Sequence, residues 1–204
     1  MIMEKAGASL NRIFALKSAG GGRGLQPIKA LHVGLKLFRK SAILHDAGIV
    51  HGDITKKNIL LSSPSGIRNL NFVTVDFVFV DWDRSFVESC SADIVFQLGP
   101  YDDFDTDHVG IGSTAGMPEE AKGRGSKIID VRRLFGVIKS LIDPIVAPGQ
   151  EFWQQWFSTA NLTPTLAINE MTSLENDLQR EALEATVVVK RLDNIIDLYA
   201  ANFS

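Results

Sequence analysis

Two carboxylates and one amide lie where regular structure is expected to break, and their chemistry suits a divalent cation and phosphate. Asp53 and Asn58 belong to one short polar loop, 51–58, and Asp81 follows the apolar run 77–80. Mg²⁺ accepts one or two carboxylates together with substrate phosphates. Phosphoryl transfer needs such a set, because the metal neutralises phosphate charge while another carboxylate orients the attacking hydroxyl. The alternative is that Asp53 is a turn residue and Asp81 a strand-end cap, which are common positions for aspartate.

A helix is predicted directly before this loop. Apolar residues between Ile28 and Ala42 recur at steps of three and four, which is typical of a helix with one buried face. Pro27 suits the first turn, and the helix is expected to end near Gly48. The glycine-rich stretch 20–24 before it is interpreted as a loop.

Two short strands are predicted after the loop, within 59–61 and 72–80, with a Ser/Pro/Gly turn following the first of them. Phe77 and Phe79 would share one face of the second strand. The polar residues would then lie at the ends of a small β-hairpin. The predicted fold class is mainly α with this hairpin.

The rest of the chain is predicted to be helical after a long irregular segment, 84–125, of the kind that is usually functional. Apolar residues in 128–142 mark a second long helix. A further helical stripe near the end of the chain consists of Leu174, Leu178, Ala182, Val189, Leu192 and Ile196.

Composition excludes several classes of protein. The 204 residues suit one domain, and the mean hydropathy of +0.08, without a run of about 18 apolar residues, argues against a membrane protein. The net charge of -3 and pI near 5.8 argue against a nucleic-acid partner. The single cysteine, Cys90, cannot form an internal disulfide, and no secretion signal is visible. We expect a cytoplasmic or nuclear protein.

Four motifs in order resemble those of protein kinases, over most of the chain up to about residue 142. The 51–58 loop reads H-G-D-I-T-K-K-N and resembles the kinase catalytic loop H-R-D-L-x-x-x-N. The D-W-D of 81–83 stands in the place of D-F-G, and G-S-T-A-G-M-P-E-E at 112–120 resembles the end of the activation segment. Asp130 resembles the buried aspartate that opens the central helix of the larger kinase lobe.

The resemblance implies a role for each matching residue. Asp53 would be the catalytic base that accepts the proton of the substrate hydroxyl. Asn58 and Asp81 would hold Mg²⁺, and Asp83 adds a further carboxylate to this metal site. Thr55 would occupy the catalytic-loop position at which serine/threonine kinases carry a phosphate-contacting lysine.

The resemblance also implies a partial kinase domain that binds ATP. Residues 1–10 look like the hinge, so that the backbone near Glu4 and Ala6 would bond adenine and Leu60 would form the floor of its site. Residues 11–204 would form the C-terminal lobe, with the smaller ATP-covering lobe missing. The chain alone is therefore expected to transfer phosphate weakly or not at all, unless another chain supplies that lobe.

Departures from the kinase pattern leave the subfamily open. Gly52 replaces the arginine of the catalytic loop, so no cation is expected there to pair with a phosphorylated activation loop. The H-G-D-x-T loop resembles small atypical kinases linked to tRNA modification. The D-W-D motif resembles fungal kinase-like families and small-molecule phosphotransferases of the aminoglycoside or choline kinase type.

Three functions follow from these observations. The first is ATP- and Mg²⁺-dependent phosphate transfer to a protein serine or threonine, with that protein as the partner. The second is a non-catalytic kinase remnant that acts as a binding scaffold. The third is a small-molecule kinase, which 112–120 disfavours because this segment resembles protein kinases specifically.

Other candidate sites have ordinary explanations. The acidic run 102–107 fails as a calcium loop because the required glycine and glutamate are absent. The aromatic group Trp153, Trp156 and Phe157 is expected in the core rather than in a partner-binding patch. His45 is expected to pack at the end of the first long helix.

Overall fold

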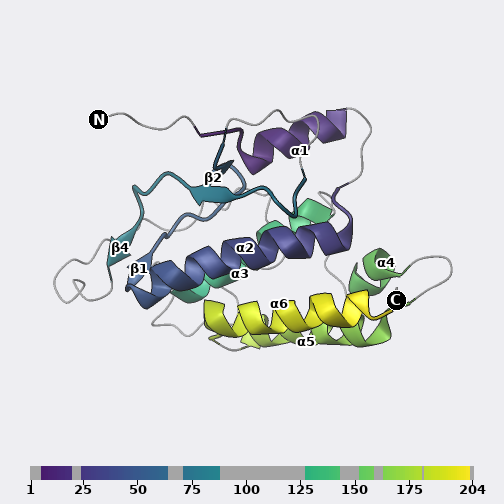
Figure 1. Cartoon of the computed structure of the whole chain (residues 1–204). Coiled ribbons are helices and arrows are strands. Elements are labelled where there is room, and N and C mark those ends of the chain that lie inside the picture. Colours follow the sequence, from purple (N-terminus) through teal and green to yellow (C-terminus); the bar gives the residue numbers. More distant parts are fainter. Residues whose placement is uncertain are drawn as a thin grey trace.

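The structure is a computed structural model that describes residues 6–19, 24–63, 71–87, 127–142, 152–158, 163–180 and 182–202. Helices dominate these residues, and the strands are short (Figure 1). The elements in chain order are α1 Leu10–Ala19, α2 Pro27–Asp46, β1 Ile49–Val50, β2 Ile59–Leu61, β3 Phe77–Phe79, β4 Phe86–Val87, α3 Lys127–Ile142, α4 Phe152–Phe157, α5 Thr165–Arg180 and α6 Ala185–Ala200.

Helix α2 is the centre of the fold and packs against α3 and α6. Its buried residues include Leu31, Leu35 and Phe38, as the helical period predicted. Pro27 stands in its first turn, and Gly48 follows its end with a φ of 76°, a conformation that favours glycine. The strands and α1 lie on one side of α2, and α5 and α6 lie on the other (Figure 1).

Helix α3 is buried along most of its length, which confirms the second long helix predicted from the sequence. Four of its buried residues carry charge: Asp130, Arg132, Arg133 and Lys139. Buried charges are costly unless they are paired or hydrogen-bonded. These side chains therefore connect α3 to its neighbours, and two of them reach the 51–58 loop.

The C-terminal stripe forms two helices, α5 and α6, that pack against each other. The prediction of one stripe is wrong at Ala182, which is exposed in the connection between them. A continuous helix over both elements would be roughly 54 Å long, more than the diameter of a small domain. The chain turns instead, because both apolar faces can then be buried on the same core.

The predicted β-hairpin is present as the antiparallel pair β2–β3, in which Ile59 lies opposite Phe79 and Leu61 opposite Phe77. Phe77 and Phe79 are both buried, so they share the inner face as predicted. Strand β3 is shorter than the predicted segment 72–80. A second antiparallel pair, β1–β4, is not predicted by the sequence period, because each of its strands has only two residues.

None of the helices in the described ranges is long and apolar enough to cross a membrane.

Candidate active site

Asp130 fixes the backbone at the start of the 51–58 loop. It lies in the first turn of α3, is 1% exposed, and accepts hydrogen bonds from the backbone N–H groups of His51 (2.7 Å) and Gly52 (3.0 Å). His45 of α2 lies 3.3 Å from the same carboxylate and also contacts Ser41. The expectation of a buried aspartate in this helix is confirmed, and His45 packs at the helix end as predicted, with Asp130 as its polar partner.

His51 joins the loop to the segment that follows β3. Its ring is buried, and Nε2 lies 3.1 Å from the carbonyl oxygen of Val80. The ring also packs against Trp82, with 4.5 Å between ring centroids. These contacts hold the 51–58 loop beside the D-W-D motif, so His51 has a structural position in the site.

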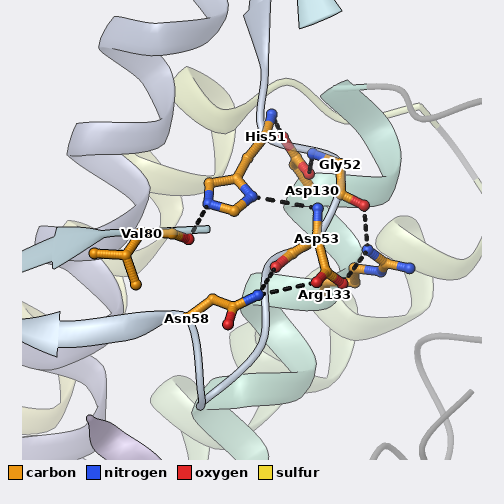
Figure 2. Close-up of polar contacts among 7 residues, drawn as sticks. All are labelled: His51, Gly52, Asp53, Asn58, Val80, Asp130 and Arg133. Atoms are coloured by element: carbon orange, nitrogen blue, oxygen red, sulfur yellow. Dashed lines mark hydrogen bonds and ion pairs between the residues drawn. The ribbon is translucent and has the colours of Figure 1, made fainter. Parts of the chain in front are cut away.

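Asp53 and Asn58 meet within the loop (Figure 2). The Asn58 amide nitrogen donates to the Asp53 carboxylate at 2.9 Å and to the Asp53 carbonyl at 3.0 Å. The amide oxygen of Asn58 points away from Asp53 (Figure 2). Thr55 is half-buried, and its carbonyl accepts the backbone N–H of Asn58 at 3.1 Å. The loop thus holds the Asp53 carboxylate against the Asn58 amide group.

Asp81 follows directly after the residue that pairs with Asn58. The backbone N–H of Val80 donates to the Asn58 carbonyl at 3.0 Å, which extends the β2–β3 pairing by one residue. Asp81 is exposed and has a φ of 65°, a left-handed conformation that aspartate tolerates better than most residues. Asp83 is also exposed. The fold therefore brings the predicted residues to one end of the hairpin.

Three of the predicted residues carry oxygen atoms that could contact a metal ion bound together with phosphate. Within the described residues, no group of three or more His, Cys, Asp or Glu side chains is arranged to hold a metal ion. The candidate set is an amide oxygen and exposed carboxylates, Asn58 with Asp81 and Asp83. Mg²⁺ is commonly bound through one or two carboxylates plus substrate phosphates.

Sequence reasoning missed Arg133 of α3. Its guanidinium donates to the Gly52 carbonyl at 2.6 Å and lies 3.6 Å from the Asp53 carboxylate (Figure 2). Residue 52 itself carries no cation, but α3 places a buried guanidinium beside it. Pairing with a phosphorylated activation loop stays a prediction, because that segment lies outside the described residues. The sequence shows only that Asp130 and Arg133 are three residues apart and share one face of the helix, which does not by itself indicate a contact with the loop.

Of the predicted adenine-binding residues, Ala6 lies at the start of the described chain and Leu60 lies in β2. Ala6 and Leu60 are both half-buried, and Ser9 forms an isolated antiparallel bridge with Leu60. The backbone N–H of Gly7 donates to the Leu61 carbonyl at 2.8 Å. The N-terminal segment therefore runs along the strand that carries Leu60. Glu4 lies outside the described residues.

Other predicted features have simpler outcomes. Trp153 and Phe157 are buried in the core, as expected, and Trp156 is partly buried against it. The acidic run 102–107 and the activation-segment motif 112–120 lie outside the described residues.

The overall structure has a protein-kinase-like fold. The chain is similar to the crystal structure of the BubR1 kinase domain, with a TM-score of 0.58 and 17% sequence identity. This match covers 96% of the chain and 60% of the BubR1 chain, so the protein spans less than two thirds of that neighbour. No family model and no curated protein sequence matches the chain. At this identity the likeness shows the fold alone.

Proposed function

We propose that this chain carries the catalytic residues of a phosphotransferase that uses Mg²⁺ and ATP, and that the chain alone transfers phosphate weakly. The observation that carries the proposal is the group of Asp53, Asn58 and Asp81 at one end of the β2–β3 hairpin. Asn58 bonds Asp53 through its side chain and holds the residue before Asp81 through its backbone. In this proposal Asp53 is the base and Asn58 and Asp81 supply oxygen ligands, which together make a set that suits phosphoryl transfer.

Asp53 is the group that receives the proton in this proposal. The acceptor hydroxyl transfers its proton to the Asp53 carboxylate while its oxygen forms a bond to the γ-phosphorus. The bond from that phosphorus to the β–γ bridging oxygen breaks, and ADP leaves. A carboxylate has about four lone-pair positions, so the contacts of Asp53 with Asn58 and Arg133 still leave room for a hydroxyl.

Asn58, Asp81 and Asp83 would hold Mg²⁺, which neutralises charge on the phosphates when it is bound. The adenine ring would lie against Leu60 and bond the backbone near Glu4 and Ala6. Protein serine or threonine is the proposed acceptor, because the sequence motif at 112–120 resembles protein kinases specifically.

The test is transfer of labelled γ-phosphate from ATP to a degenerate serine/threonine peptide mixture by the full chain, for which we expect a weak but measurable rate. We expect Asp53→Asn to lower the rate about 10²- to 10⁴-fold, the usual contribution of a general base. Asp46→Asn is the matched control, since Asp46 is an exposed carboxylate at the end of α2 that has no part in the proposed site. Equal rates for the chain and Asp53→Asn would contradict the proposal.

The second candidate is a non-catalytic scaffold with the same fold. It is favoured by the fact that both Asp53 carboxylate oxygens already have partners within the protein. A folded chain that transfers no phosphate to peptides, aminoglycosides or choline, with Mg²⁺ present, would support this candidate over both enzyme types.

A further inference from the structure

One face of α3 holds the peptide units on both sides of Gly52. Asp130 accepts the Gly52 N–H at 3.0 Å, and Arg133 donates to the Gly52 carbonyl at 2.6 Å. Both side chains are buried, with 1% and 7% of their surface exposed. The start of the 51–58 loop is therefore fixed by an anion and a cation that lie three residues apart on one helix.

The same guanidinium lies beside the proposed base. Arg133 Nη1 is 3.6 Å from Asp53 Oδ1, while Asn58 Nδ2 is 2.9 Å from Asp53 Oδ2 (Figure 2). One oxygen of the carboxylate thus has a partner from α3, and the other has a partner from the 51–58 loop. Two partners on opposite oxygens restrict rotation of the carboxylate more than either partner does alone.

The loop has no room for a side chain of its own at position 52. Gly52 has a φ of 76°, and a Cβ at this position would overlap the carbonyl oxygen of Arg84. A cation carried by residue 52 would require the 81–85 segment to move. The cation that contacts Gly52 is Arg133 of the neighbouring helix α3 instead.

The geometry points to Arg133 as a positioning residue that orients the Asp53 carboxylate through the Gly52 carbonyl and an ion pair. This inference rests on the proposed function, because it assigns Arg133 a part in the reaction of Asp53. Arginine suits this position, since its guanidinium stays charged when buried and presents several donors in one fixed plane.

The test compares Arg133→Met with Arg132→Met in the full chain. Arg132 is the adjacent buried arginine on α3, and it donates to the Gln179 carbonyl of α5 at 3.2 Å. We expect Arg133→Met to lower kcat for peptide phosphorylation at least about tenfold with KM for ATP little changed, because small misplacements of a reacting group cost up to about 100-fold. Arg132→Met should keep most of kcat.

A second measurement separates this inference from the proposed function. The urea midpoints of Arg133→Met, Asp53→Asn and the double variant report whether the two side chains interact, whether or not the chain transfers phosphate. We expect the double variant to be less destabilised than the sum of the single variants. If Arg133→Met does not fold, Arg133→Lys replaces it in both measurements, since one ammonium cannot reproduce the planar fork.

Additive midpoints, or a kcat for the Arg133 variant equal to that of the chain or of Arg132→Met, would overturn the inference. A chain that transfers no phosphate but shows non-additive midpoints would refute the proposed function. It would still support the interaction between Arg133 and Asp53.

Discussion

At the scale of single residues, Gly52 shows how closely the loop and the 81–85 segment approach each other. The residue is buried, has a positive φ and lies against the Arg84 carbonyl. The positive φ and the nearby carbonyl both require glycine, because a Cβ would be strained by the backbone and would overlap a main-chain atom.

Gly52→Ala is therefore expected to destabilise the protein by about 1–3 kcal/mol, the usual cost of a residue in a sparsely populated conformation, plus the cost of moving the Arg84 carbonyl. Gly136→Ala is the matched control. Gly136 lies within α3, and a Cβ there meets nothing within 4 Å. Alanine at 136 should stabilise by about 0.5–1 kcal/mol. Urea unfolding measures both, and equal effects would refute this view of Gly52.

Some residues of the candidate site could be predicted from the sequence, and one could not. Asp53, Asn58 and Asp81 could be found because their types and spacing match a known motif. Arg133 could not, because its partners are a backbone carbonyl and a carboxylate about eighty positions earlier in the chain. A contact to a backbone atom does not depend on the side chain of the contacted residue, so the sequence does not reveal it.

At the scale of elements, α2 holds the segment that leads into β3. Lys36 Nζ donates to the Val75 carbonyl at 2.6 Å, and Lys40 Nζ lies 3.1 Å from the Asp76 carboxylate. Burial alone would raise the pKa of Asp76, but the hydrogen bond from the Phe77 N–H and the Lys40 ammonium outweigh it and hold this pKa below its usual 3.8. The pairing thus helps to fix strand β3, which lies just before Asp81.

This lowered pKa predicts a pH dependence of stability. A carboxylate with a depressed pKa contributes stability above about pH 3.8, and the contribution is lost as the pH falls through the folded-state value. Asp76→Asn should therefore be less stable than the chain at pH 7, by less than about 1 kcal/mol because the pair is partly exposed. Urea unfolding at pH 7 and pH 3 should show this difference shrinking, and a constant difference would contradict the argument.

The two long helices α2 and α3 could be predicted because apolar residues recur over many turns. Helix α2 buries one face, and α3 buries most of its surface. The division of the C-terminal helical stripe into α5 and α6 could not. The apolar period resumes at Ala185 without a proline or glycine to mark the turn, so periodicity alone does not show where the chain reverses. The place of the reversal is decided by the packing of α6 against α2.

At the scale of the whole molecule, a buried polar cluster joins α3, α4 and α5. Lys139 lies 2.7 Å from one carboxylate oxygen of Glu175, and the Trp153 indole donates to the other at 2.6 Å. The Lys139 ammonium also lies 4.8 Å from the centre of the Phe152 ring. These contacts connect the three helices, and the bond from Arg132 to the Gln179 carbonyl is a further polar link between α3 and α5.

Breaking this pair from one side should be costly. Glu175→Gln leaves a buried ammonium without its counter-charge, and we expect a loss of about 3 kcal/mol in the free energy of unfolding. The double variant Lys139→Met/Glu175→Gln should lose less, because both charges are removed while the amide can still accept from Trp153. As a control, Asp193→Asn breaks the exposed pair with Arg39 and should cost less than about 1 kcal/mol. A double variant less stable than Glu175→Gln would contradict this account.

The central claim is that the end of the β2–β3 hairpin is a nucleotide–metal site. Calorimetry of ATP binding to the full 204-residue chain, with and without Mg²⁺, tests it most directly. Asp81→Asn is the informative variant, because asparagine tolerates the same left-handed backbone and removes only the charge. Asp46→Asn serves as the control on an exposed carboxylate elsewhere.

We predict Mg²⁺-dependent binding that weakens at least about tenfold, or 1.4 kcal/mol, in Asp81→Asn and is unchanged in Asp46→Asn. A folded chain that does not bind ATP, or that binds it equally well with Asn at position 81, would contradict the assignment of this site.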